Sequence, residues 1–345
     1  MSSTPQTATE QAIPVLKRSD TVIMGRQDFL SVLLRSISGE LYKIRRRAMP
    51  KILLLIAIII MIIAFSFSVL AVAFSPSVSC TTDSNGKEYC IPKSQAAIQK
   101  QKEAASESLR LPSSLSMSIS VINFIGTISL LILTGSIVGG EYATGTIRLM
   151  LTRGPTRAQF LLAKIGIVII CVLTTVFLLI LVGIIVGALF NLTTGIAVDF
   201  SFFTGEWLFH AILYVLIAAL GLSVYAMIAV CLATLGKTTA AGIAGALIWW
   251  FFESTLGGIL IIVGALNKGP IGNLLQSIPD YFIGSNISAL RDHQNQYLIN
   301  GATQATSTTN THDISDVHAI IVLVVYLVVF IGIAWWVNHQ RDITN

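Results

Sequence analysis

Residues 139–164 read GGEYATGTIRLMLTRGPTRAQFLLAK. This short basic stretch lies between two long apolar runs, and each run can supply the roughly 20 residues that one membrane-spanning helix needs. A compact polar segment between two spans is a surface turn, because lipid leaves no partner for an open backbone. The stretch therefore predicts a helical membrane protein in which a charged hairpin joins two spans.

The composition of the whole chain supports this class. Of its 345 residues, 54% are hydrophobic and 11% are charged, whereas charged residues make up roughly 25% of soluble domains. The apolar runs do not alternate as the strands of a membrane barrel do. We expect an all-α integral membrane protein with six transmembrane helices, near 52–74, 116–138, 165–190, 207–235, 240–266 and 317–337.

Two segments precede the first span. Residues 1–23 show no period and predict a disordered cytosolic tail, ahead of a six-span domain over 24–345. Within 24–51, Glu40 and Lys43 are interpreted as lying on other faces than the apolar residues. This pattern predicts an amphipathic helix at the membrane interface, whose apolar residues are Phe29, Leu30, Leu33, Leu34, Ile37, Leu41 and Ile44.

We expect a protein of the plasma membrane, and the distribution of Lys and Arg predicts that both its termini lie in the cytosol. The loop 75–115 then lies outside the cell, where Cys80 and Cys90 flank an Asn-Gly turn and are expected to form a disulfide. The outer segment 267–316 begins with a stretch apolar enough to re-enter the membrane. Residues 236–239 form a minimal turn between the fourth and fifth spans, so these two spans form a tight helical hairpin.

Glu253 lies in the middle of the fifth predicted span. An ionisable side chain at that depth is costly unless it is paired, protonated or facing a wet cavity, so it is a candidate for a substrate or ion pathway. Asn123 of the second span is a second candidate. The structural alternative is a neutral Glu253 that forms a hydrogen bond with a neighbour such as Asn123.

The sequence lacks the motifs that mark several kinds of enzyme. No G-x-x-x-x-G-K-[ST] motif for binding ATP and no H-E-x-x-H motif for binding zinc is present in the sequence. We therefore expect no catalytic residues, no metal site and no cofactor in this chain, and we expect that it is not an enzyme. The basic residues cluster beside the spans, which argues against nucleic acid as a partner.

The hairpin resembles the cytosolic signature of ABC-2 type transporter permeases, which follows the second span in that family. The match runs through Gly140-Glu141-Tyr142, Gly145-Thr146-Ile147-Arg148, Leu151-Thr152-Arg153, Arg157 and Phe160-Leu161-Leu162-Ala163-Lys164. The amphipathic lead-in helix and the six spans also resemble the family. The loop of about forty residues after the first span is longer than in its simplest members.

The resemblance implies a permease that dimerises, with itself or a related chain, and binds a separate cytosolic ATPase that holds ATP and Mg. The expected function is export of a drug, antibiotic, peptide or lipid-like substrate. We interpret Glu141 as part of the first turn of a helix that carries Arg148 two turns later. The expected ATPase-coupling residues are Glu141, Tyr142, Gly145, Thr146, Arg148, Arg153 and Arg157.

Two alternatives stay open at this point. The hairpin arginines can instead be solvated residues that only set the topology. The protein can also be a motor-free channel or ion-coupled transporter in which Glu253 carries a proton or cation.

Overall fold

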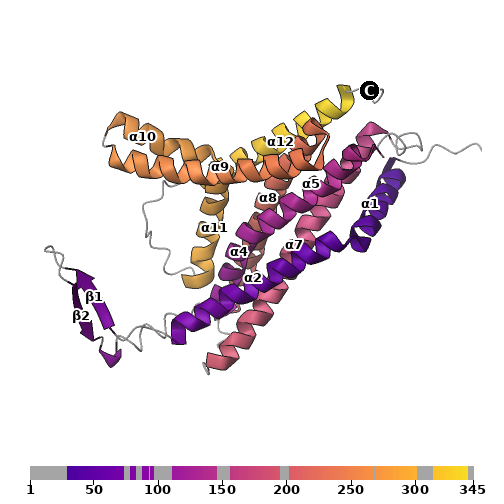
Figure 1. Cartoon of the computed structure of the whole chain (residues 1–345). Helices are drawn as coiled ribbons and strands as arrows, with labels where there is room; N and C mark the ends of the chain where they lie inside the picture. Colours follow the sequence, from indigo (N-terminus) through magenta and orange to yellow (C-terminus); the bar gives the residue numbers. More distant parts are fainter. Residues whose placement is uncertain are drawn as a thin grey trace, which may run out of the picture.

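The computed structural model describes residues 29–73, 78–82, 88–92, 94–96, 111–145, 156–194, 202–267, 269–300 and 314–340. Six helical segments in these ranges are long and apolar enough to cross a membrane, which confirms the predicted number of spans. They are α2 (Ala48–Ala73), the continuous α4 (Leu111–Val121), η1 (Ile122–Gly126) and α5 (Thr127–Ala143), α7 (Arg157–Thr194), α8 (Gly205–Gly236), α9 (Thr239–Leu266) and α12 (Asp316–Gln340) (Figure 1).

The amphipathic helix is α1 (Phe29–Arg46), which packs on α7 and is separated from α2 by Arg47 alone (Figure 1). One end of every span lies at the level of α1. Gly139 near the end of α5 meets the α8–α9 turn, and Asn338 near the end of α12 bonds to Arg157 at the start of α7. Successive spans therefore run in opposite directions, and we call this side of the molecule the α1 end.

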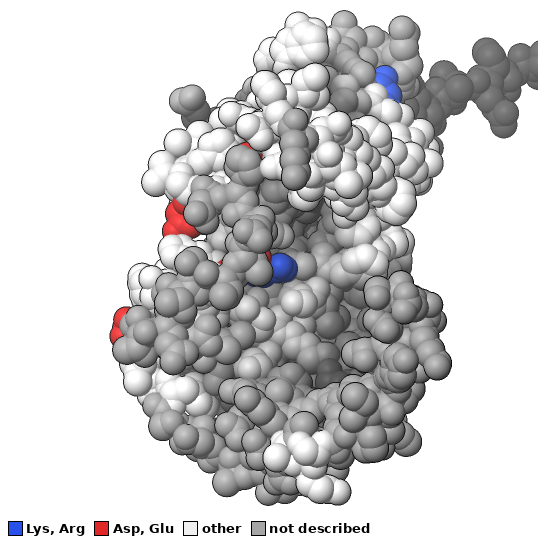
Figure 2. All heavy atoms as spheres, turned by 90° about the vertical axis from the view of Figure 1, so that its left-hand side faces the viewer, with Lys and Arg blue, Asp and Glu red and all other residues white. Residues whose placement is uncertain are grey.

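The centre of the bundle is α8. It packs against α5, α7, α9, α11 and α12. In the most apolar stretch of α8, 67% of the residues are buried, compared with 17% in the corresponding stretches of α2, α9 and α12. Large apolar side chains on these outer helices are exposed, as expected for surfaces that face lipid. Figure 2 shows the side of the molecule that lies on the left in Figure 1, where few of the described side chains are charged.

Helices α5 and α9 cross at close range through glycines. A Cβ atom on Gly139 would lie 2.5 Å from the carbonyl oxygen of Thr238, and one on Gly135 would lie 2.8 Å from the backbone nitrogen of Ile243. Gly242 of α9 faces the same contact. This is the small-residue spacing that allows two membrane helices to approach at their backbones.

The start of the charged hairpin differs from the prediction. Helix α5 continues to Ala143, and Gly145 follows its cap with a φ of 66°, so Glu141 lies in the last turn of α5. The interpretation of Glu141 as part of a helix's first turn is wrong, because packing on α9 outweighs the weak helix propensity of Gly139 and Gly140. Residues 146–155 lie outside the described part of the chain.

The segment after α9 folds back along it. Helix α10 (Pro270–Ser277) and the short η2 (Ile278–Tyr281) run beside the second half of α9, where Gly264 faces Gln276 and Gly257 faces Phe282. Helix α11 (Ile283–Asn300) then runs along α8. The segment thus lies against two spans, and its re-entry into the membrane stays a prediction.

One β-hairpin is the exception to the helical class in the described residues. Strands β1 (Val78–Thr82) and β2 (Glu88–Pro92) pair antiparallel and lie apart from the helices (Figure 1). Their register places Cys80 directly opposite Cys90. The disulfide between them stays a prediction.

Candidate functional site

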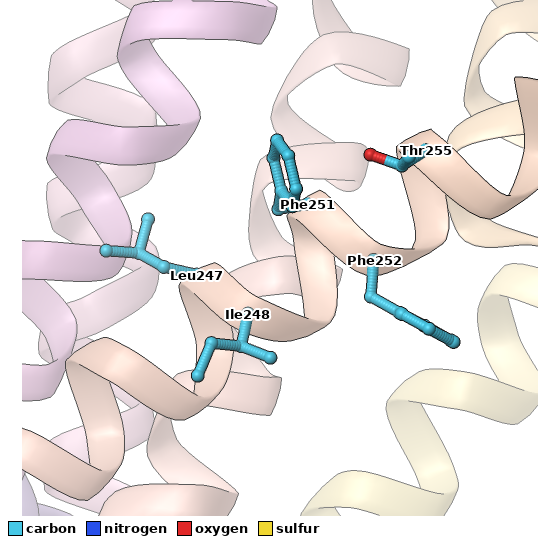
Figure 3. Close-up of a pocket in the computed structure, with 5 residues that line it drawn as sticks. All are labelled: Leu247, Ile248, Phe251, Phe252 and Thr255. Carbon is cyan, nitrogen blue, oxygen red and sulfur yellow. The ribbon is translucent and has the colours of Figure 1, made fainter.

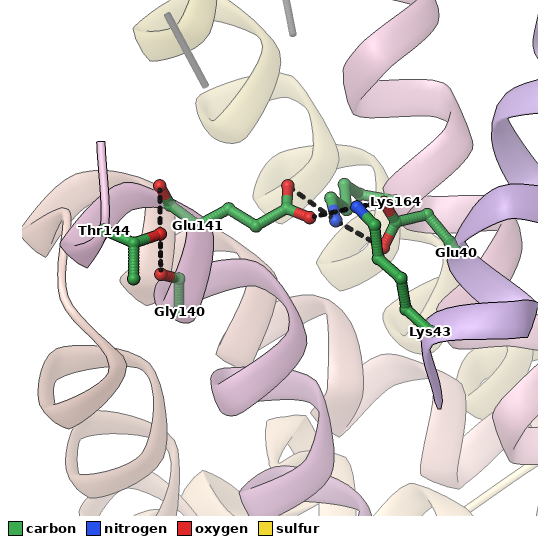
Figure 4. A network of polar contacts seen from close by, with 6 residues as sticks. All are labelled: Glu40, Lys43, Gly140, Glu141, Thr144 and Lys164. Atoms are coloured by element: carbon green, nitrogen blue, oxygen red, sulfur yellow. Dashed lines mark hydrogen bonds and ion pairs between the residues drawn. The ribbon is translucent and has the colours of Figure 1, made fainter. Parts of the chain in front are cut away.

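Four charged side chains meet at the α1 end, between α1, α5 and α7 (Figure 4). Lys164 Nζ lies 2.7 Å from Glu40 Oε2 and 2.8 Å from Glu141 Oε2. Lys43 Nζ lies 2.7 Å from Glu40 Oε1 and 3.1 Å from Glu141 Oε1. Each carboxylate places one oxygen on each ammonium, so the four groups form a closed, neutral ring. We call them the charge ring.

The charge ring is shielded from solvent. Lys164 is 1% exposed, Glu141 6% and Glu40 7%, whereas Lys43 lies nearer the surface. Removing charges from water costs several kcal/mol per ion, so such groups persist only when each is paired and hydrogen-bonded. Every group in the ring is ion-paired, and hydrogen bonds join Lys43 to both glutamates and Lys164 to Glu40. The ring thereby joins the amphipathic helix to two spans.

The pKa directions follow from the same geometry. Burial by itself raises the pKa of Glu40, but attraction to Lys164 and the hydrogen bonds from both lysines outweigh it and lower this pKa below 4.5. Burial lowers the pKa of Lys43, but its bonds to Glu40 and its attraction to Glu141 raise it above 10.5. The stabilisation from Glu40 is therefore lost as pH falls through its pKa, and that from Lys43 as pH rises through its own.

The predicted position of Glu40 is wrong. Glu40 follows Ile37 by three residues and precedes Ile44 by four, so it belongs to the same face of α1 as those two residues. That face packs on α7, where Lys164 lies opposite Glu40. The sequence did contain a signal for this position, because Glu40 continues the helical spacing of the apolar residues Ile37 and Ile44.

The other predicted coupling residues are distributed over several environments. Tyr142 is half-buried against the core, and Gly145 is exposed. The guanidinium of Arg157 donates to the carbonyl oxygen of His339, at 3.2 Å, near the end of α12. Glu141 and Arg157 thus bind other parts of this chain. The remaining three, Thr146, Arg148 and Arg153, lie outside the described residues.

Glu253 is 8% exposed and faces the protein interior. Its Oε1 accepts a 2.8 Å hydrogen bond from the backbone nitrogen of Gly284, and its Oε2 accepts one of 3.3 Å from the hydroxyl of Tyr225. Gly284 lies in the first turn of α11, whose N–H groups have no partner within the helix. The carboxylate therefore caps α11, and the suggested bond to Asn123 is wrong.

Asn123 lies in η1, a π-helical turn within the second span. Its side-chain nitrogen is buried and has no hydrogen-bond partner among the described residues. The neighbouring Phe124 contacts Trp250 of α9, with ring centroids 5.5 Å apart. π-Helical turns are often found at functional sites, but Asn123 and Glu253 do not form one joint polar site.

We expect Glu253→Ala to lower the free energy of unfolding by about 1–3 kcal/mol, because it leaves buried donors of α11 and Tyr225 without an acceptor. Glu253→Gln keeps a carbonyl oxygen for Gly284 and should lose less. Thermal unfolding of the purified protein in detergent measures both. Equal unfolding temperatures for wild type and Glu253→Ala would contradict the capping role.

A pocket on α9 is open and apolar (Figure 3). It is lined by Leu247, Ile248, Phe251, Phe252 and Thr255, all from this one helix. The large side chains Ile248, Phe251 and Phe252 are exposed, whereas Glu253 on another side of the helix is buried. The pocket offers no charged group, and such a surface suits lipid chains.

Comparison with known protein families assigns the chain to one of them. Residues 97–344 match the family model described as "Protein of unknown function (DUF2705)". The chain belongs to the DUF2705 family. The match begins after α2 and the β-hairpin and covers the remaining spans of this DUF2705 protein, including Glu141, Lys164 and Glu253. No curated protein matches it.

Proposed function

We propose that this DUF2705 protein is the membrane-spanning permease subunit of an ATP-driven exporter in the plasma membrane. A separate cytosolic ATPase holds ATP and Mg and powers it, and a second permease copy completes the transporter. Its substrate is a drug, antibiotic, peptide or lipid-like molecule. The observation that supports this best is the charge ring, which ties the two spans flanking the basic hairpin to each other and to α1.

The charge ring suits a segment that receives force. Lys164 of α7 binds Glu141 of α5, so the two ends of the 144–156 connection are held at fixed separation. Both lysines also bind Glu40 of α1, and α1 continues into α2 after one residue. A load on the hairpin therefore acts on three spans together. Arg148 and Arg153 of the hairpin are the proposed contacts to the ATPase.

The first test is whether a soluble ATPase with a Walker A motif is encoded beside the gene of this protein. The second test uses such an ATPase together with the full-length protein. Reversing the charge at Arg148 and Arg153 together, each to Glu, should reduce co-purification of the ATPase at least tenfold, because charge-assisted contacts at an interface are lost. Lys237→Glu in the exposed α8–α9 turn is the control and should retain binding. If the double variant binds the ATPase and exports at the normal rate, the coupling role fails.

The alternative is a motor-free transporter that uses Glu253. Both oxygens of this carboxylate accept hydrogen bonds from the chain itself, and these bonds account for its buried position without a transported ion. Transport that persists without any ATPase and follows an ion gradient would favour the alternative.

A further inference from the structure

Helix α1 has a second surface beside the one that packs on α7. An apolar ridge of Leu30, Leu34 and Leu41 faces outward, and the first two of these side chains are 67% and 63% exposed. These leucines fall on one side of the helix, next to the stripe of Ile37, Glu40 and Ile44, of which Glu40 is buried and the two isoleucines are half-buried. The ridge covers nothing in the described part of the molecule.

Basic residues accompany this ridge. Arg35, Arg45 and Arg46 of α1 are exposed, Arg47 connects α1 to α2, and Lys51 lies near the start of α2. The ion pairs within the described residues involve none of these five side chains.

The exposed surface of α1 is also free of acidic groups. Glu40 is the one acidic residue between Phe29 and Arg46, and it is buried in the charge ring. The ring therefore does two things for α1: it holds the helix against α7, and it neutralises the helix's own negative charge. What remains outside is a cationic, apolar surface.

We infer that the outer face of α1 binds anionic phospholipids in the leaflet where α2 begins. Arginine forks pair with phosphate through two parallel hydrogen bonds, and basic clusters beside a span attract anionic headgroups. Leucines beside such arginines are the pattern of a helix that lies in the interface. The inference does not depend on the proposed transport function.

Continuity with the lipid-facing surface favours lipid over a protein partner. Ile52, Leu55, Ile56 and Ile59 of α2 are all exposed and follow α1 after one connecting residue. Acyl chains that cover these side chains have their headgroups at the start of α2, where Arg45, Arg46 and Lys51 lie.

The experiment measures lipid binding to the intact protein in neutral detergent. Native mass spectrometry follows titration with phosphatidylglycerol, and phosphatidylcholine with the same acyl chains is the reference lipid. The wild type should bind phosphatidylglycerol more tightly than phosphatidylcholine, and added salt should reduce the difference. Changing Arg35, Arg45 and Arg46 together to Gln should weaken phosphatidylglycerol binding at least tenfold.

Two further variants make the test specific. Changing the same three residues to Lys keeps the charge but removes the planar fork, so binding should be intermediate. Arg291→Gln alters a basic residue of α11, remote from α1, and should bind as the wild type does. Unchanged phosphatidylglycerol binding in the triple Gln variant would overturn the inference. If that variant bound lipid normally but lost the ATPase, the surface would be a protein-docking site instead.

Discussion

Replacing Lys164 with Met is expected to lower the free energy of unfolding by about 3–5 kcal/mol, because removal of one partner leaves buried charge without compensation. Lys164 is 1% exposed and holds an oxygen of both Glu40 and Glu141. Without it, two carboxylates face each other with Lys43 as their one remaining cation in the ring. Thermal unfolding in detergent, followed by size-exclusion chromatography, measures the loss.

Two comparison variants separate this effect from lost packing. Lys43→Met should cost less, since water reaches that part of the ring. Adding Glu40→Gln to Lys164→Met restores charge neutrality and should recover part of the stability, which a double-mutant cycle detects. If Lys164→Met unfolds at the wild-type temperature, or if Glu40→Gln makes it worse, the charge ring does not stabilise the α1 end as described.

Replacing Gly139 with Val is expected to lower the free energy of unfolding by about 3 kcal/mol, because overpacking at a close contact displaces backbone. The new Cβ would lie 2.5 Å from the carbonyl oxygen of Thr238 and 2.6 Å from Cα of Thr239. Both are backbone atoms that cannot rotate aside. Helices α5 and α9 must then separate at the α1 end, which also moves Glu141 away from Lys164.

Gly140→Val is the matched control. It makes the same change at the next residue of α5, where a Cβ would be 3.8 Å from Cγ2 of Thr239, an ordinary contact. Any difference between the two variants therefore reports the α5–α9 approach rather than helix propensity. Equal unfolding temperatures for both variants would show that the approach contributes nothing.

The local pattern of the sequence was sufficient to predict the six spans and the turn between α8 and α9. A helix needs about 20 apolar residues to cross the hydrocarbon core, and this requirement acts on contiguous sequence. The six spans could be counted for that reason. The turn between α8 and α9 was predictable as well, because only residues 236–239 separate two long apolar runs in the sequence. In the structure Lys237 and Thr238 connect the two helices.

Contacts between residues that are far apart in the sequence could not be predicted from its local pattern. Lys164 and Glu40 are 124 positions apart, and neither shows in its own neighbourhood which charge it will meet. The same holds for Glu253, whose partners Gly284 and Tyr225 come from two other helices. Gly139 was interpreted as the first residue of the charged hairpin, yet it lies inside α5, which continues to Ala143 and meets Thr238 at Gly139.

The amino-acid sequence by itself therefore determined that this is a helical membrane protein with six spans and an amphipathic helix before the first. Lipid imposes that result one segment at a time, since each span must satisfy its own backbone hydrogen bonds. Tertiary structure alone decided where the buried charges go. A charge removed from water needs an opposite charge or donor within hydrogen-bonding distance, and only the packing of α1, α5 and α7 supplies those partners.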